Sequence, residues 1–407
     1  MTSKSYEWED GAELGEHSQK KHQILREYFR QYLKTRCQLP QQEKFRLAIV
    51  DGFSGGGRYE NGEYGSPIVF VDTLIQTAKE INIYRNSQGF AALTIECLIV
   101  FNDKDPEAIH LLKQNLAPHL AAAKEQDGLI IRPQYFSDSF EHIYPEIKDR
   151  LLATRCNNVL FNLDQCGYSH VTTACIRDIM ISWKSAEVIL TFMIKALLTF
   201  LSPNEKKSGV PLEPEMQEKV NCIIENDKLL SKRAWMGEAE KIVYSHLNEC
   251  APYVSPFAIN NPSGWKYWLM HFARSYRARQ VYNDVLHQHG EAQGHVGGAG
   301  LNMLSYTPQN PTFYLFDETS RDTARNALAE DIPDLVSHSG DTIPMLQFYE
   351  TAYSETPAHS EDIHQAIIDN PDLEVVTKNG GVRRKAGSIK SDDTLRLTNQ
   401  KSFFFNF

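Results

Sequence analysis

The sequence contains no run of about 18 consecutive apolar residues, the length that a membrane-spanning helix requires. Its first 16 residues are polar and acidic, and they lack the apolar stretch of a secretory signal. We therefore expect a cytoplasmic protein that makes no contact with a membrane.

The cysteines also form no pattern that indicates a function. The chain has seven cysteines, an odd number, and no two of them have C-x-x-C spacing. This distribution argues against a structural zinc site and against a disulfide framework, and it fits a reducing compartment. The histidines form no metal-binding pattern either, so we expect no metal site.

The chain lacks an excess of positive charge as well. It has 42 lysines and arginines and 52 aspartates and glutamates, which gives a net charge of -10. A protein with this charge has no basic coat, so any contact with nucleic acid must come from a local patch. Its length of 407 residues suits a main domain with appended parts.

What the sequence does contain is a glycine-rich turn directly after a short apolar run. Residues 47–50 predict a buried strand, Asp51 follows them, and residues 52–57 read GFSGGG. Glycine lets the backbone approach a ligand without a Cβ in the way. In doubly wound α/β domains, such a strand and turn bind an adenosine-bearing cofactor. The alternative is a glycine-rich surface loop without a ligand.

Two nucleotide-binding signatures are absent from this turn. A P-loop requires Lys and then Ser or Thr after its last glycine, whereas Arg58 and Tyr59 stand there. The glycines also lack the G-x-G-x-x-G spacing of the dinucleotide fingerprint. A cofactor without phosphates needs instead an acid for a cationic group, close backbone for a carboxylate and a second acid for ribose hydroxyls. S-adenosylmethionine fits these needs.

Further apolar runs predict the other strands of a parallel sheet covered by helices on both faces, namely residues 93–101, 129–131, 158–163 and 187–194. Asp103 follows the second strand, where such folds bind a ribose diol. Asp138 follows the third strand, where an acid could face the adenine amino group. Asp105 precedes a proline and is best interpreted as a helix N-cap.

Four segments together resemble the three-Cys-motif partner proteins (TcmP), which are bacterial proteins with a class I methyltransferase-like core: DGFSGGGRYENGEYGSP, FNDKDPEAI, LDQCGY and FARSYRARQVYNDVLH. The resemblance covers most of the chain. It implies a doubly wound, Rossmann-like α/β fold with an S-adenosylmethionine site, and a three-Cys-motif protein as a partner. It implies much less about the substrate.

The resemblance also assigns roles to positions of this chain. The cofactor positions that it implies are Asp51, Gly52, Ser54, Gly55, Gly57, Asp103 and Asp138. On the acceptor side, Asp164 would hold the methyl acceptor and Tyr168 would stack on it. Family members tend to have proline after this aspartate, whereas this chain has Gln165, so a fixed turn that would aim the acid is lost. Cys166 could act as a nucleophile on a pyrimidine, but a buried small hydrophobe is the better interpretation.

Two segments offer local positive charge. In residues 265–290, the arginines at 274, 277 and 279 lie near aromatic residues. We interpret this segment as an amphipathic packing helix with solvated arginines, with phosphate binding as the alternative. At the C-terminus, a helix over residues 359–370, a strand over residues 373–377 and a second strand from Val382 predict a winged-helix unit.

The basic wing of this unit could contact a phosphate backbone through Arg383, Arg384 and Lys385. A winged helix that serves dimerisation or protein docking is the alternative. The expected division of the chain is a methyltransferase-like domain over residues 1–335 with a helical insertion around 203–300, a linker over 336–358 and a winged-helix-like module over 359–407.

The function that we expect from the sequence is S-adenosylmethionine-dependent methyl transfer to a base of DNA or RNA, within a bacterial, phage or defence-associated system. Two alternatives stay open. One is a catalytically silent, cofactor-binding partner subunit of a cysteine-motif protein. The other is a nucleic-acid-binding component whose glycine turn holds some other nucleotide.

Overall fold

The computed structural model describes residues 16–165, 170–193, 241–259, 267–290, 293–302 and 313–399. The chain divides into two compact units. The first unit comprises Met1–Lys228 and Ile242–Arg274, and the second comprises Leu229–Lys241 and Ser275–Phe407. None of the helices in these ranges is long and apolar enough to cross a membrane.

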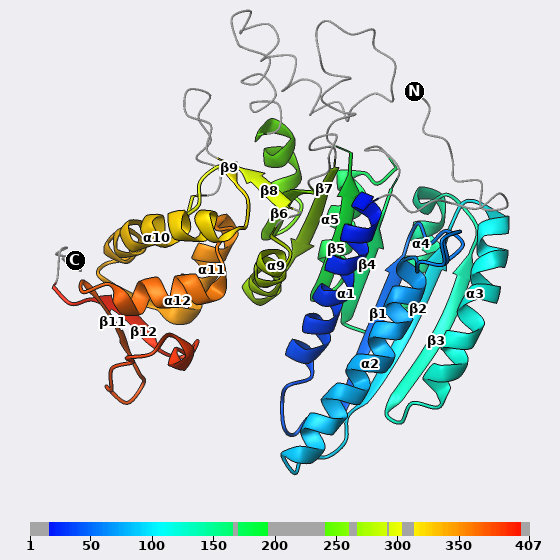
Figure 1. Cartoon of the computed structure of the whole chain (residues 1–407), viewed down its shortest axis with the longest axis horizontal. Helices are drawn as coiled ribbons and strands as arrows, with labels where there is room; N and C mark the ends of the chain where they lie inside the picture. The colour runs from blue at the N-terminus through cyan, green and yellow to red at the C-terminus, as the bar shows by residue number, and fades with distance from the viewer. Residues whose placement is uncertain are drawn as a thin grey trace, which may run out of the picture. The chain divides into compact units, whose positions relative to one another are not determined.

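The described part of the first unit contains a mostly parallel seven-stranded sheet in the order β3-β2-β1-β4-β5-β7-β6 (Figure 1). Its strands are β1 (Lys44–Asp51), β2 (Thr94–Asn102), β3 (Leu129–Phe136), β4 (Asn158–Leu163), β5 (Ser185–Phe192), β6 (Tyr253–Ile259) and β7 (Tyr267–Ala273). Strands β1 to β5 are parallel, whereas β7 runs antiparallel to both β5 and β6. This arrangement is compatible with a Rossmann-like core.

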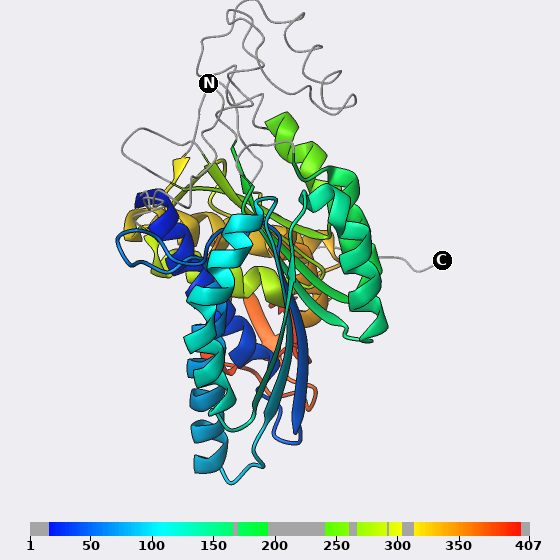
Figure 2. The ribbon, with the colours of Figure 1, turned by 90° about the vertical axis from the view of Figure 1, so that its right-hand side faces the viewer.

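The helices of the first unit cover both faces of the sheet (Figure 2). On one face lie α1 (Glu16–Arg36), α2 (Ser66–Ser87) and α3 (Pro106–Lys124), and on the other lie α4 (Phe140–Ala153) and α5 (Thr173–Ser182). Because helices shield both faces, the central strands can be apolar on both sides. The last five residues of β1 and of β4 are buried accordingly. Asp105 caps α3 by accepting from the Glu107 N–H, as predicted.

The segment between residues 203 and 300 is not a purely helical insertion. Residues 241–248 are helical, but residues 253–259 and 267–273 form β6 and β7 and extend the sheet. Almost all residues of these two strands are buried. Ser255 and Pro256 interrupt the apolar run of β6, and residues 267–273 lie in a segment that was interpreted as a helix, so neither strand was expected. Residues 194–240 lie outside the described part of the chain.

Arg85 joins the loops at the amino edge of the sheet and is 2% exposed. Its guanidinium donates hydrogen bonds to four backbone carbonyls, those of Leu39, Pro40, Gln42 and Ala91, over distances of 2.6 to 2.9 Å. A buried charge is tolerated when its donors are satisfied. Arg85 therefore closes the two loops that precede β1 and β2.

The second unit combines helices with a small antiparallel sheet in the order β10-β12-β11. Its elements are α9 (Tyr276–Gln288), β8 (Gln293–Val296), β9 (Phe313–Tyr314), α10 (Glu318–His338), β10 (Thr342–Pro344), α11 (Met345–Glu355), α12 (Ser360–Asp369), β11 (Leu373–Val376), the 3-10 turn η3 (Ala386–Ser388) and β12 (Thr394–Leu397). Strands β10, β11 and β12 together with α10, α11 and α12 form a winged-helix arrangement, in which residues 377–393 are the wing.

Three details of this unit differ from the sequence-based expectation. Residues 336–358 are not a linker, because β10 and α11 lie within them and α11 buries Phe348 and Tyr353. Helix α10 packs against α12, so a division at residue 335 would cut through one unit. The second strand of the wing begins at Thr394, whereas Val382 makes an isolated bridge to Val376.

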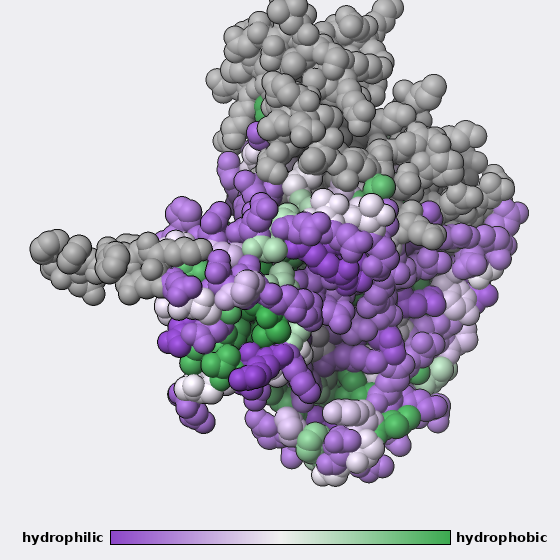
Figure 3. Space-filling model, turned by 60° about the vertical axis from the view of Figure 1, so that its left-hand side comes forward, coloured by the Kyte–Doolittle hydropathy of each residue, from purple (hydrophilic) through white to green (hydrophobic). Residues whose placement is uncertain are grey.

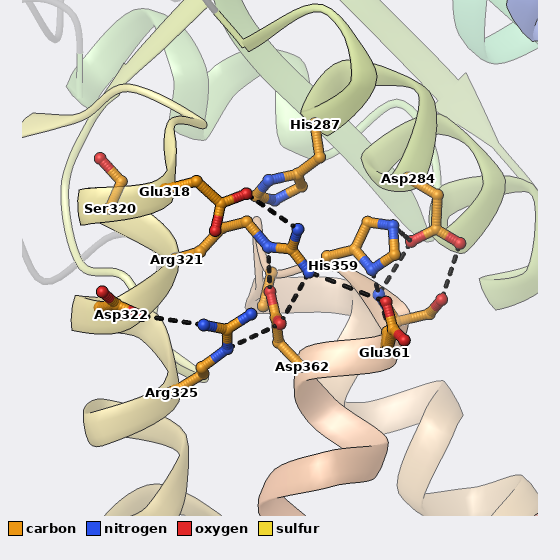
Figure 4. A network of polar contacts seen from close by, with 12 residues as sticks. Asp284, His287, Glu318, Ser320, Arg321, Asp322, Arg325, His359, Glu361 and Asp362 are labelled. Carbon is orange, nitrogen blue, oxygen red and sulfur yellow. Dashed lines mark hydrogen bonds and ion pairs between the residues drawn. The ribbon is translucent and has the colours of Figure 1, made fainter. Parts of the chain in front are cut away.

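A polar network connects α9, α10 and α12 (Figure 4). Asp362, 1% exposed, accepts from Arg321 at 2.8 and 2.9 Å and from Arg325 at 3.0 Å. Burial alone would raise the pKa of Asp362, but the two guanidinium groups hold it below its ordinary value. Asp284 of α9 accepts from both the backbone N–H and the hydroxyl of Ser360. These contacts fix α12 within the unit.

Candidate functional site

The sheet of the first unit has its topological switch point between β1 and β4. The chain runs outward from β1 through β2 to β3 and then returns to β4 on the other side of β1. In open α/β sheets, ligands bind in the crevice at the carboxyl ends of the strands at this point. Asp51, the last residue of β1, lies in register with Phe101 of β2 and Asn162 of β4. The predicted strand tips therefore converge at this edge.

Asp51 is fully buried and anchors the start of the glycine turn. Its carboxyl group accepts hydrogen bonds from the Ser66 hydroxyl at 2.7 Å and the Asn162 amide at 3.0 Å. Burial raises the pKa of Asp51 to about 7, and the nearby carboxylates of Asp164 and Asp103 act in the same direction. The group can thus gain or lose a proton near neutral pH.

The glycine turn requires glycine at two of its positions. A Cβ on Gly52 would lie 2.7 Å from Leu163 Cδ2 and 2.8 Å from Phe140 Cδ2. Gly57 has a φ of +78°, which L side chains rarely adopt, and a Cβ there would lie 2.6 Å from Leu112 Cδ1. A side chain at position 52 would therefore displace Leu163 and Phe140, and one at position 57 would displace Leu112 and strain the backbone.

Ser54 and Asn102 join the turn to the end of β2. The Ser54 hydroxyl donates to the Asp51 carbonyl and accepts from the Asn102 N–H, and the Ser54 N–H donates to the Asn102 carbonyl. The fully buried Asn102 side chain donates to the carbonyls of Gly52 and Asp138. Asn102 thus connects three strand tips. Sequence reasoning missed it, although its position at the end of a strand was a signal.

Asp103 is held against the turn. Its Oδ2 accepts from the Gly55 N–H at 2.9 Å, and its Oδ1 accepts from the Asp105 N–H at 3.0 Å. Burial raises the pKa of Asp103. A carboxylate has about four lone-pair sites, so this one can accept further hydrogen bonds from a ligand diol.

Asp138 has a different environment from the other predicted acids. Its side chain is 38% exposed and lies 2.5 Å from His142 Nδ1, one turn along α4. This contact with His142 lowers the pKa of Asp138. Its backbone carbonyl is the group that Asn102 contacts. Asp138 therefore borders the site with a carboxylate that already has a partner.

Asp164 forms an ion pair with Lys21 of α1, which sequence reasoning did not foresee. Lys21 Nζ lies 2.6 and 2.5 Å from the two carboxylate oxygens, and Lys21 is 8% exposed. Burial acts to raise the pKa of Asp164, but Lys21 and the Thr191 hydroxyl hold it below its ordinary value. His22 follows on α1, and burial together with Lys21 lowers its pKa to about 4. Helix α1 thus places a cation and a neutral imidazole near Asp164.

Gln165 fixes the backbone where the resemblance would have placed a proline. Its Oε1 accepts from the N–H groups of His170 and Val171 at 2.9 and 3.0 Å, and the residue is 2% exposed. Its side chain therefore fixes the backbone at residues 170 and 171 by hydrogen bonds. Tyr168 and Cys166 lie outside the described residues.

In the wing, the three predicted nucleic-acid-binding residues have unequal surroundings. Arg383 donates to both oxygens of Asp393 at 2.9 and 3.0 Å, and Asp393 is 1% exposed. Arg384 and Lys385 are exposed, and among the described residues neither forms an ion pair. Arg383 thus shapes the wing, whereas its two neighbours face solvent.

The arginines of residues 265–290 do not lie on one solvated helix face. Arg274 precedes α9 and donates to the Met180 carbonyl. Arg279 is fully buried and donates to the Thr356 carbonyl. The prediction of solvated arginines is therefore wrong for Arg279, because a long side chain on a helix can also satisfy backbone carbonyls in the interior.

Comparison with known proteins identifies the C-terminal part. Residues 304–380 match the family model of the GMT-like wHTH (winged helix-turn-helix) domain. The chain carries a winged-helix module. The match covers less than half of the chain and leaves the seven-stranded sheet unassigned. No curated protein matches the chain.

Two solved structures are similar to the chain at a low level. A possible exported protein from Bordetella parapertussis is 12% identical over 61% of this chain and 67% of its own, with a TM-score of 0.27. The YcgJ protein from Bacillus subtilis is 10% identical over 62% of this chain and 98% of its own, with a TM-score of 0.20. Scores at this level carry no conclusion about fold or function. In the described ranges, no group of three or more His, Cys, Asp or Glu side chains is placed to hold a metal ion.

The raised pKa of Asp51 predicts a pH-dependent stability that Asp51→Asn removes. The folded protein keeps this proton up to pH about 7, whereas an unfolded chain loses it near pH 4. The folded state then binds more protons than the unfolded state, so the stability that this group contributes is present at low pH and is lost as the pH rises toward 7. Urea denaturation between pH 5 and 8 should show wild type losing roughly 1 kcal/mol per pH unit relative to the variant, up to pH 7. Parallel stability profiles would contradict the buried, protonated state.

Proposed function

We propose that the first unit binds S-adenosylmethionine at the carboxyl edge of its sheet and that the protein transfers the methyl group to nucleic acid. The observation that carries the proposal is the Asp103 carboxylate, which is fixed against the Gly55 N–H beside the switch point of a parallel sheet. A fixed acid at the tip of the second strand suits a ribose diol.

The residues of the site fit S-adenosylmethionine better than a phosphorylated cofactor. The turn is followed by Arg58 and Tyr59, and the P-loop Lys-Ser/Thr pair is missing. The Asp103 carboxylate at this edge disfavours a triphosphate and favours a cationic ligand. When bound, the cofactor supplies a methyl group on a sulfonium, which is already a reactive donor.

In this proposal the protein contributes mainly by positioning. Asp103 would hold the ribose, and the turn that begins at Asp51 and Gly52 would hold the amino-acid end. Asp164 would accept a hydrogen bond from the methyl acceptor, and the ammonium of Lys21 would keep that carboxylate ionised. Support for nucleic acid as the substrate comes from the winged-helix module, a class of domain that often binds nucleic acid.

Asp164→Asn tests the acceptor side separately from cofactor binding. The amide keeps the size of the side chain but removes the charge that pairs with Lys21, so we expect methyl transfer to fall by about 100-fold or more. S-adenosylmethionine affinity should stay within about twofold. The assay follows labelled methyl groups into DNA, RNA and a three-Cys-motif protein, and it includes Lys184→Gln, an exposed lysine before β5, as a matched control. Unchanged transfer by the variant would remove Asp164 from the mechanism.

A catalytically silent, cofactor-binding subunit is the second candidate function. The observation that favours it is the Lys21 ammonium, which already contacts both oxygens of Asp164. If the pair is purely structural, S-adenosylmethionine binds but no labelled methyl group appears in any of the three acceptors. Thermal stability would then fall in Asp164→Asn without any activity to lose.

A further inference from the structure

The helix of the winged-helix module that would be expected to enter a DNA groove is α12, and its exposed face is acidic. Helix α12 has the sequence SEDIHQAIID and contains neither lysine nor arginine. Its exposed residues are Glu361, Gln365 and Asp369, which lie four residues apart on one face, and Glu361 also lies 3.9 Å from Arg321 of α10. Gln365 donates to Asp369 at 2.7 Å. Such a face repels phosphate groups.

The remaining polar side chains of α12 contact other residues of the unit. Asp362 pairs with the two arginines of α10. His364 contacts the Tyr349 hydroxyl at 2.8 Å, and burial lowers the pKa of His364 to about 4, so it carries no charge at neutral pH. The 3-10 turn η3 of the wing packs against α12 as well. Helix α12 is therefore poorly suited to read bases in a major groove.

The wing carries an excess of the opposite charge, with four exposed cations against the exposed Asp392. Its exposed cations are Lys378, Arg384, Lys385 and Lys390, and within the described part of the chain none of them forms an ion pair. Two other arginines near the wing are occupied, since Arg383 pairs with Asp393 and Arg396 with Glu374. These pairs brace the wing and its strands and leave the four exposed cations to solvent.

Hydrophilic residues cover most of the face drawn in Figure 3, and hydrophobic ones lie in smaller groups between them. The chain as a whole has a net charge of -10, so a patch of four cations is a local exception. Local positive charge on an acidic protein restricts phosphate contacts to that patch.

We propose that the winged-helix module binds nucleic acid through its wing, by phosphate contacts that do not depend on base sequence, while α12 stays outside the groove. The inference rests on the proposed function insofar as that function names nucleic acid as the substrate. It adds the surface that makes the contact and predicts that this surface carries little sequence information.

The test is fluorescence anisotropy of the full chain with a labelled DNA duplex, a scrambled duplex of equal length and an RNA duplex, across a range of salt concentrations. Each phosphate contact contributes about -0.9 to the slope of log K against log salt for B-DNA, so four contacts predict a slope of roughly -3 to -4. The two DNA duplexes should bind within about twofold of each other. Replacing Lys378, Arg384 and Lys385 with glutamine should bring the slope to about -1.

Two matched variants separate the wing from α12 and from general charge. Gln365→Ala changes the exposed face of α12, and Lys184→Gln removes an exposed lysine of the first unit; each should leave affinity within about twofold. The inference is overturned if the wing triple variant binds like wild type, or if Gln365→Ala abolishes a preference for one of the two DNA duplexes. Either result would leave nucleic acid as the proposed substrate. If wild type binds no duplex at low salt, both this inference and the nucleic-acid part of the proposed function fail. Cofactor binding is measured in parallel by calorimetry and distinguishes that failure from loss of the methyl-donor site.

Discussion

Replacing Asp103 with asparagine is expected to weaken S-adenosylmethionine binding by about 100-fold. The carboxylate is fixed by the N–H groups of Gly55 and Asp105, and its remaining lone pairs would accept two hydrogen bonds from the ribose diol. Hydrogen bonds to a charged group contribute about 1.5–3 kcal/mol each, and about 1.4 kcal/mol corresponds to a tenfold change in affinity. Isothermal titration calorimetry of both proteins measures the loss directly.

Asp105→Asn is the matched control for this experiment. It changes the neighbouring acid in the same chemical way, but asparagine caps a helix as well as aspartate does. Cofactor affinity should therefore change by less than about twofold. Equal losses in the two variants would show that negative charge near α3, and not a ribose contact, governs binding.

Replacing Arg85 with methionine is expected to lower the free energy of unfolding by about 3 kcal/mol or more. Methionine keeps most of the apolar stem but leaves four backbone carbonyls without their donor. Each buried acceptor that loses its partner costs about 1–3 kcal/mol, less where water can enter. Urea denaturation at pH 7 measures the change, with the exposed Arg132→Met as a control that should stay within about 0.5 kcal/mol. A loss below about 1 kcal/mol would mean that the loops hold without Arg85.

The sheet was largely predictable because continuous apolar runs mark strands that are buried on both faces. The predicted strand over residues 158–163 coincides with β4, and the run at 47–50 lies within β1. The candidate site was placed by the same argument, since carboxyl ends of parallel strands meet at one edge, and it stays a prediction. Strand β6 was missed because Ser255 and Pro256 interrupt its apolar run, and proline argues against a strand. Strand β7 was missed because its short apolar run does not separate a strand from a buried helix.

The contacts between distant residues were not predictable. Lys21 and Asp164 are 143 positions apart, and their pairing depends on how α1 packs on the sheet. The wing shows the same limit at short range: Arg383, Arg384 and Lys385 are equivalent in sequence, yet Arg383 alone among them pairs with Asp393 in the described residues. Composition locates a basic segment, whereas the fold decides which of its cations stay exposed.

The central claim is that the carboxyl edge of this sheet binds a methyl donor that carries an amino acid and a nucleoside. Calorimetric titration of the full chain with S-adenosylmethionine, S-adenosylhomocysteine, NADH and ATP tests it most directly. We predict saturable binding of the first two ligands at one site per chain, and none of the other two. A folded protein that gives no saturable heat with either of the first two ligands, or that binds NADH or ATP in their place, would contradict the account.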